Sequence, residues 1–358
     1  MGNFNGSSSR LLLSAFLLTS FGLIMVYSSS WAYSDYYYGN SYYLLVKQTV
    51  AAVIGIAALV FFAKVDLTKI IDLSGYLLAG FTFLTLITLV PGLSTGGRWL
   101  DLGPLSFQPT EGLKFGLITW TSLAIVDLGD RIKDFSRGIS PFLIVIGAIS
   151  LITLLQPDFS MTLLLISTAG FLLFLGGARL VDLGKVIGLG VPLLGGLLVI
   201  EPYRLQRLIS FFGSGRDQLD TGYQLSQSLL AFGSGGIFGK GLGGSVEKFL
   251  YLPAGYNDFI YSIIGEELGF LGTLIVIGLF GVLGFEGFRI SLEQEDRIKG
   301  LIAAGFTFVI CFQALLNFSV TLGLLPVTGL TLPFISYGGS SLIVSLAMIG
   351  CLVNIGNS

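Results

Sequence analysis

Charged residues stand at three places inside or beside long apolar stretches, where they could carry chemistry. Glu111 and Lys114 lie three residues apart, Asp158 follows a proline, and Asp258 precedes an apolar run. A carboxylate at such a position can accept a proton from a hydroxyl group and so act as a general base. The same residues could instead form a buried ion pair or cap a helix, because a charge at membrane depth needs a partner. The residues alone leave both interpretations open.

The chain has no histidine, so imidazole cannot serve as its acid, base or metal ligand. Acid–base chemistry must therefore depend on Asp, Glu, Lys or Tyr. Cys311 and Cys351 lie in apolar runs, where a thiol behaves as a small hydrophobic group. We expect neither a disulfide framework nor a metal site from these two residues.

A glycine-rich segment, Gly239–Gly244, matches the GxGxxG pattern of dinucleotide-binding sites. That pattern needs a preceding strand and a following helix in a βαβ unit, whereas this segment lies in a loop between apolar stretches. We therefore expect flexible turns or a close approach of the backbone to a ligand. The sequence also lacks a P-loop motif, and no nucleotide cofactor is predicted.

The composition indicates that lipid surrounds most of the chain. Of the 358 residues, 53% are hydrophobic and only 11% are charged, and the mean hydropathy is +0.86. A soluble domain carries about 25% charged residues, because water must solvate its surface. The chain is therefore predicted to be an integral membrane protein. Its net charge of −2 does not favour nucleic acid as a partner.

We predict one all-α, polytopic membrane domain over residues 1–358, with about ten transmembrane helices and one large extracytoplasmic loop at 202–260. Each predicted span is an apolar stretch long enough to cross a hydrocarbon core of about 30 Å. The spans lie near residues 11–31, 44–63, 74–92, 109–126, 139–156, 159–177, 182–200, 262–285, 300–318 and 339–354.

Basic residues fall mostly on one side of this topology. With the N-terminus inside, the cytoplasmic ends hold Arg10, Lys64, Lys69, Arg131, Lys133, Arg137, Arg179, Lys185, Arg289, Arg297 and Lys299. Because basic loops stay in the cytoplasm, both termini are predicted to be cytoplasmic and the 202–260 loop to lie outside. The start of that loop predicts a short amphipathic helix in the membrane interface, since apolar residues recur there at helical spacing. These residues are Leu205, Leu208, Ile209 and Phe212.

Near the C-terminus, the segment from Leu325 to Ser341 contains two prolines and several hydroxyl groups between apolar runs. Irregular backbone at membrane depth is tolerated only where it lines a cavity or is buried in protein. The segment is therefore predicted to line a substrate site.

Over essentially its whole length the chain resembles the SEDS family (shape, elongation, division and sporulation proteins). The resemblance is carried by Gly22–Ser28, Gly97–Trp99, Phe107–Glu111 with Lys114, Leu155–Asp158, Gly222–Gln224, Gly233–Gly241, Asp258–Phe259, Gly265–Gly269 and Leu332–Ser341. Within the family, Gly22–Ser28, Tyr251–Pro253 and Gly329–Pro333 are more similar to the division branch (FtsW) than to the elongation branch (RodA).

The resemblance implies a peptidoglycan glycosyltransferase that polymerises lipid II outside the cytoplasmic membrane, with inversion at the anomeric carbon, for septal wall synthesis. It assigns the role of general base to Asp258. Family members commonly carry histidine where this chain has Tyr256, so imidazole cannot be essential here. The residues expected to bind substrate are Arg98, Gln108, Glu111, Lys114, Asp158, Lys240, Glu266 and Ser340.

The implied partners are a class B penicillin-binding protein (an FtsI-like transpeptidase), other division proteins of the membrane, lipid II and membrane lipids. A divalent cation, Mg or Mn, is a candidate cofactor. The expected location is the cytoplasmic (inner) membrane, crossed several times, with the active site outside. Two other classes stay open, namely a lipid II flippase and a division scaffold without activity. A RodA-like elongation polymerase is the alternative within the enzyme class.

Overall fold

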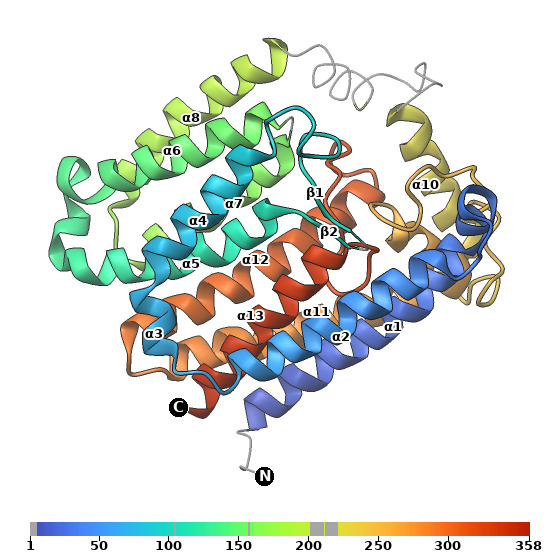
Figure 1. Cartoon of the computed structure of the whole chain (residues 1–358), viewed down its shortest axis with the longest axis horizontal. Helices are drawn as coiled ribbons and strands as arrows, with labels where there is room; N and C mark the ends of the chain where they lie inside the picture. The colour runs from blue at the N-terminus through green and yellow to red at the C-terminus, as the bar shows by residue number, and fades with distance from the viewer. Residues whose placement is uncertain (1–5, 104, 157, 201–210, 212–220) are drawn as a thin grey trace.

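The computed structural model describes residues 6–103, 105–156, 158–200, 211 and 221–358, and Figure 1 traces their course. In chain order the elements are α1 (Gly6–Tyr38), α2 (Tyr43–Phe62), α3 (Leu67–Asp72), α4 (Ser74–Ile87), β1 (Leu100–Leu102), β2 (Leu105–Phe107), α5 (Pro109–Leu128), η1 (Gly129–Lys133), η2 (Phe135–Ile139), α6 (Ser140–Leu155), α7 (Phe159–Leu175), α8 (Leu180–Ile200), α10 (Thr221–Gly235), α11 (Ile260–Glu293), α12 (Arg297–Thr321) and α13 (Gly339–Asn357). The only sheet in the described part of the chain is the antiparallel β1–β2 hairpin.

Each predicted membrane span overlaps one long helix, and the all-α fold class is confirmed. Among the described residues, six helical stretches are long and apolar enough to cross a membrane, while α4 and α7 are apolar but shorter. The helix α4 ends at Ile87, before the predicted end at residue 92. Pro91 and Gly92 follow it, and proline and a glycine with φ of 87° do not continue a helix. The residues that predict an amphipathic helix, Leu205, Leu208, Ile209 and Phe212, lie outside the described part of the chain.

The helices α12 and α13 form the centre of the bundle. In their most apolar stretches, 78% and 72% of the residues are buried inside the protein. The helix α12 contacts α5, α7, α11 and α13, and α13 also packs along α2. These helices therefore provide a rigid base for the connections at their ends.

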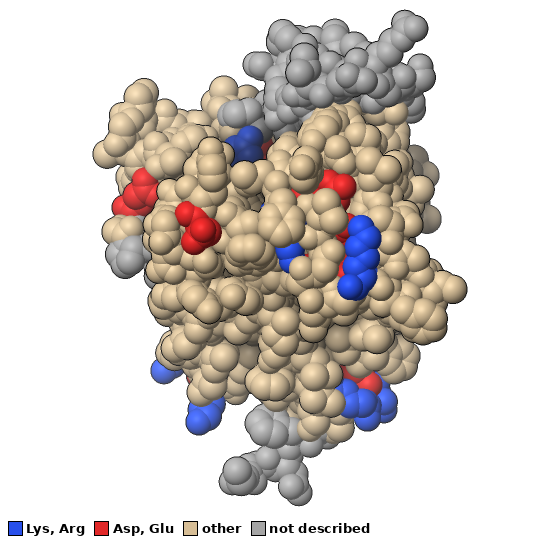
Figure 2. Space-filling view, turned by 90° about the vertical axis from the view of Figure 1, so that its right-hand side faces the viewer, with Lys and Arg blue, Asp and Glu red and all other residues tan. Residues whose placement is uncertain are grey.

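The two ends of the described chain lie at the same end of the bundle (Figure 1), where α1 begins and α13 ends. The short basic connections η1, η2 and α7–α8 belong to this end, because each follows a helix that runs toward it. On the face drawn in Figure 2, mainly basic side chains lie near the lower end, separated by uncharged surface from charged groups of both signs higher up. Some loops join a helix that runs away from the termini to the next helix, which runs back toward them. These loops lie at the opposite end of the bundle.

The glycine-rich segment packs closely against a bend in α11. Gly269 interrupts α11 with φ of 67° and ψ of −165°. A Cβ on Gly239 or on Gly269 would lie 2.6 Å or less from the amide nitrogen of the other, so only glycine fits at either position. The amides of Lys240 and Gly241 donate to the carbonyls of Glu266 and Glu267, at 3.0 and 2.9 Å.

Candidate active site

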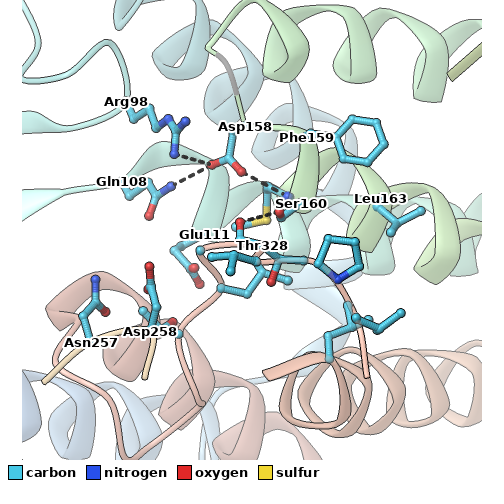
Figure 3. A pocket seen from close by; sticks show the side chains of 18 of the residues that line it. Arg98, Gln108, Glu111, Asp158, Phe159, Ser160, Leu163, Asn257, Asp258 and Thr328 are labelled. Carbon is cyan, nitrogen blue, oxygen red and sulfur yellow. Dashed lines mark hydrogen bonds and ion pairs between the residues drawn. The ribbon is translucent and has the colours of Figure 1, made fainter. Parts of the chain in front are cut away.

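A cavity of about 490 Å³ opens among the connections at the end of the bundle opposite the termini. Four segments that are distant in sequence line it: the β-hairpin region, the α6–α7 turn, the residues before α11, and the α12–α13 connection. The predicted site residues on its wall are Arg98, Gln108, Glu111, Asp158 and Asp258. In Figure 3, Asp158 and Asp258 lie on opposite sides of the cavity, with Glu111 between them.

Asp158 both caps a helix and faces the cavity. One carboxylate oxygen accepts a hydrogen bond from the Met161 amide at 3.1 Å, which caps α7. The other accepts from the Gln108 amide at 3.4 Å and lies 3.9 Å from the Arg98 guanidinium (Figure 3). Burial raises the pKa of Asp158, and Arg98 acts in the opposite direction. The Arg98 Nε also donates to the Gln156 carbonyl at 2.8 Å, which holds the guanidinium beside Asp158.

Glu111 and Lys114 form the predicted ion pair, at 2.5 Å and with both side chains almost fully buried. Glu111 is part of the cavity wall, whereas Lys114 points away to the side-chain oxygen of Gln313, at 2.8 Å. Gln313 in turn donates to the Thr331 carbonyl at 2.9 Å. The pair therefore connects α5 to the irregular C-terminal segment, and it places one carboxylate toward the cavity.

The backbone around Asp258 is held at three consecutive carbonyl groups. The Tyr337 amide donates to Tyr256 at 3.1 Å, and the Ser336 hydroxyl donates to Asn257 at 2.7 Å. The side-chain amide of Asn317 donates to the Asp258 carbonyl at 2.8 Å. Such satisfied carbonyls fix the direction in which the Asp258 side chain leaves the backbone.

Asp258 is not the cap residue of α11. That helix is preceded by Phe259, whose side chain makes no capping hydrogen bond. Gly329 lies beside this carboxylate, because a Cβ at Gly329 would be 3.5 Å from the Asp258 Oδ2, and the absence of a side chain there leaves room next to it. The helix-cap interpretation of Asp258 is thus wrong, and the alternative of a carboxylate in a cavity agrees with the geometry.

The C-terminal segment lines the cavity as predicted, with residues 325–331 on the wall. Its amide partners on α12 were not identified from the sequence. Gln313 and Asn317 carry side-chain amides four residues apart, on the same face of a largely apolar stretch of α12. Asn317 also donates to the Leu330 carbonyl at 2.8 Å. A polar stripe at that spacing was the signal that could have found them.

Four predicted substrate-binding residues do not lie on the cavity wall, namely Lys114, which is described above, and Ser340, Lys240 and Glu266. Ser340 sits behind Gln108, whose backbone amide donates to its hydroxyl at 3.0 Å. Lys240 pairs with Glu266 at 2.6 Å, and Glu266 also accepts from the Val246 amide at 3.1 Å. Both therefore hold the loop 236–250 on α11, and their predicted contact with substrate stays a prediction.

No group of three or more His, Cys, Asp or Glu side chains in the described part of the chain is arranged to hold a metal ion. The carboxylates of the cavity therefore do not form a ready-made metal site. The predicted divalent cation stays a prediction.

The fold and the cavity define a polytopic membrane protein with an acidic cavity where its connections meet. Residues 9–358 match the family model of FtsW, RodA and SpoVE, described as cell cycle protein. The chain belongs to this family, as the SEDS resemblance predicted.

Two curated relatives illustrate the similarity. The chain is 38% identical to stage V sporulation protein E of Bacillus subtilis (strain 168) over 349 residues, which cover 96% of this chain and 95% of the relative. It is 37% identical to the probable peptidoglycan glycosyltransferase FtsW of Legionella pneumophila over 352 residues, with 96% and 89% covered.

Solved structures share the fold. A chain of a peptidoglycan synthase complex, solved to explain how polymerization and crosslinking are coordinated, aligns with a TM-score of 0.81 at 25% identity, over 99% of this chain and 98% of that one. The rod shape determining protein RodA of Thermus thermophilus aligns with a TM-score of 0.70 at 26% identity, over 99% and 97%. The protein is therefore a multi-pass membrane protein.

Proposed function

We propose that the chain is a peptidoglycan glycosyltransferase that polymerises lipid II into glycan strands at the outer face of the cytoplasmic membrane, for septal wall synthesis. The observation that carries the proposal is the Asp258 carboxylate, in the wall of a large cavity and on a backbone held at three successive carbonyls. Relatives described as probable peptidoglycan glycosyltransferases support the activity. Relatives in the FtsW and SpoVE branches support a role in division or sporulation walls.

In the proposed reaction, Asp258 removes the proton of the acceptor 4-hydroxyl. The hydroxyl oxygen bonds to the anomeric carbon of the donor sugar while the bond from that carbon to the pyrophosphate oxygen breaks. The proton passes to the Asp258 carboxylate, and the electron pair leaves with the lipid pyrophosphate, which inverts the carbon. A positioned base contributes about 10² to 10⁴ in rate. The pyrophosphate already activates the donor, so the step needs no nucleotide.

The other wall residues would position the sugar. The carboxylates of Glu111 and Asp158 and the amide of Gln108 offer hydrogen bonds to hydroxyl and amide groups, and Arg98 is shared between Asp158 and the Gln156 carbonyl. Lys114 is neutralised by Glu111. The cavity therefore suits the acceptor sugar better than it suits a pyrophosphate.

The chain would act as one domain over residues 1–358, with both termini in the cytoplasm and the cavity outside. The basic residues at the end that carries the termini support this orientation. A class B penicillin-binding protein is the proposed partner, because a similar chain is found in a complex that couples polymerization to crosslinking.

The proposal is tested by supplying lipid II to purified protein in detergent micelles, with and without a class B penicillin-binding protein. The wild type and Asp101→Asn, an exposed carboxylate on β1, should form glycan strands. Asp258→Asn should lose at least about 10²-fold in rate, since the amide cannot accept the proton. Equal polymer yield from Asp258→Asn would refute the base assignment.

The same assay separates the other functions. Micelles have no leaflets, so polymer formation there excludes a flippase as the sole activity. A scaffold would form no polymer, and Asp258 variants would still support growth while the partner is recruited.

A further inference from the structure

A second, smaller cavity adjoins the first. It has a volume of about 220 Å³ and is lined by Lys47 of α2, Trp99, Tyr256, Asn257 and Tyr337, among others. Trp99 and Asn257 line both cavities, so the two cavities adjoin at these residues. Asn257 is the residue directly before Asp258. Any group bound in the smaller cavity would therefore lie next to the group that Asp258 contacts.

The two cavities differ in charge. The larger cavity is lined by one basic residue, Arg98, and by three acidic residues, Glu111, Asp158 and Asp258. The smaller one has a lysine, Lys47, and no acidic residue among its described lining residues. Its tyrosines stay neutral near pH 7, because burial raises the pKa of Tyr337 to about 12 and raises that of Tyr256 as well. A phosphate would thus be repelled from the larger cavity and attracted to the smaller one.

Lys47 is available to bind an anion. Its ammonium group lies 4.7 Å from the centre of the Tyr43 ring, and no carboxylate in the described part of the chain forms an ion pair with it. By contrast, Lys114, Lys240 and Lys248 are each paired with a glutamate. Lys47 is half-buried beside the cavity, where reduced hydration strengthens its attraction for a phosphate.

Two further features fit a lipid-linked ligand. The Oδ1 atom of Asn257 is buried and has no hydrogen-bond partner among the described residues. It can therefore accept a hydrogen bond from a sugar hydroxyl group where the two cavities meet. On α2, Val46 and Val50 are exposed next to Lys47 and would face lipid in the membrane. A polyprenyl tail could follow this surface while its phosphates reach Lys47.

We propose that the smaller cavity is the subsite for the pyrophosphate of the lipid-linked sugar donor, and that Lys47 stabilises the negative charge on this leaving group. The inference rests on the proposed glycosyltransferase function. In this arrangement the donor pyrophosphate lies beside Lys47 and the acceptor hydroxyl lies beside Asp258. The donor sugar lies between them, next to Trp99 and Asn257. As the sugar–phosphate bond breaks, the electron pair stays on the pyrophosphate beside the ammonium group.

The first test measures binding of geranylgeranyl pyrophosphate to the full-length Asp258→Asn protein in detergent, with geranylgeraniol as the ligand without phosphates. Adding Lys47→Met should weaken pyrophosphate binding by about 10- to 100-fold, as expected for the loss of a charged hydrogen bond. Lys47→Arg should keep most of the affinity, and Lys64→Met, just beyond the far end of α2, should leave it unchanged. Geranylgeraniol binding should not depend on Lys47.

The second test uses lipid II polymerisation by otherwise wild-type protein. Lys47→Met should lower kcat at least about 10-fold with partial rescue by Lys47→Arg, because the leaving group develops its charge only in the transition state. A rise in KM with unchanged kcat would overturn the donor assignment, since it would mean that Lys47 only holds the acceptor. Wild-type affinity and kcat in a folded Lys47→Met protein would overturn the subsite itself. Absence of polymerisation by the wild type would instead refute the proposed function.

Discussion

At the scale of single residues, the site depends on side chains that hold the backbone as much as on the carboxylates that face the cavity. Asp258 would act as the general base, and Asn317 fixes the position of the Asp258 backbone. The Asn317 amide donates to the carbonyls of both Asp258 and Leu330, at 2.8 Å each, and so joins two walls of the cavity. Leaving such buried carbonyls without a donor costs about 1–3 kcal/mol.

Asn317→Leu should therefore lower kcat about 10-fold or more while KM changes little, because the base is displaced and the substrate contacts remain. Asn317→Asp should behave in the same way, since it keeps the shape and removes the donors. Ser319→Ala, on the same helix and away from the cavity, is the control. Steady-state kinetics with lipid II provide the measurement, and a wild-type kcat in Asn317→Leu would show that the hydrogen bonds do not position Asp258.

The Glu111–Lys114 pair allows stability to be separated from activity. Lys114→Met should destabilise the protein by about 3–5 kcal/mol, because it leaves a buried carboxylate without its partner. The exchange Glu111→Lys with Lys114→Glu should recover much of that stability, but not activity, since it places an ammonium group in the cavity wall. Thermal unfolding and polymerisation are measured on the same samples. Recovery of both would mean that the pair is only structural.

At the scale of elements, the loop before Asp258 is fastened to α11 by two buried glutamates. Lys248 lies 3.1 Å from Glu267, and both side chains are almost completely buried. Ser28 of α1 donates to the same carboxylate at 2.6 Å. Glu266 holds Lys240 and the backbone of the loop in the same region. The loop therefore has one position relative to α1 and α11, and the segment that follows it is presented to the cavity.

Lys248→Met should lower the free energy of unfolding by about 3–5 kcal/mol, because Glu267 would stay buried without its cation. Lys248→Met combined with Glu267→Gln should be more stable than the single variant, since no unpaired charge remains. A double-mutant cycle by thermal unfolding in detergent measures the coupling. Additive effects of the two changes would show that the pair contributes no coupling, and Lys64→Met, which is exposed, controls for the loss of a lysine.

At the scale of the whole molecule, both ends of the described chain lie at one end of the helix bundle and the cavity lies at the other. The wall of the cavity is formed by connections at the end opposite the termini and by the helix residues next to them. The arrangement would separate the site for a lipid-linked substrate from the cytoplasm by the full length of the bundle. This orientation is open to a direct test.

In a background of Cys311→Ser and Cys351→Ala, we expect Asp101→Cys on β1 to react with a membrane-impermeant maleimide in intact spheroplasts. Lys133→Cys on η1 should react only after lysis, because the basic connections are expected in the cytoplasm. Both positions are exposed in the folded protein, so accessibility within the protein does not limit labelling. The reverse pattern would place the cavity inside the cell and contradict the proposed orientation.

The sequence alone was sufficient for the class of protein, the spans and the family. Lipid requires about twenty apolar residues in each crossing helix, and this constraint is local enough to read from Leu11–Trp31 or from residues 339–354. The acidic residues of the cavity could also be identified, because a charge in an apolar sequence is costly and therefore informative. Glu111 and Lys114 pair as their spacing predicted.

Only the tertiary structure decided which of these residues meet. Asp158 and Asp258 lie a hundred residues apart and share one cavity, whereas Lys240 and Glu266, which seemed equally suitable, hold a loop. It also showed that Gly239 approaches α11 at Gly269, and that Asn257 and Trp99 line two adjoining cavities. Helix spans follow from the contact of each segment with lipid, which is a local property. The partner of a polar side chain depends on how distant segments pack, and no local pattern contains that information.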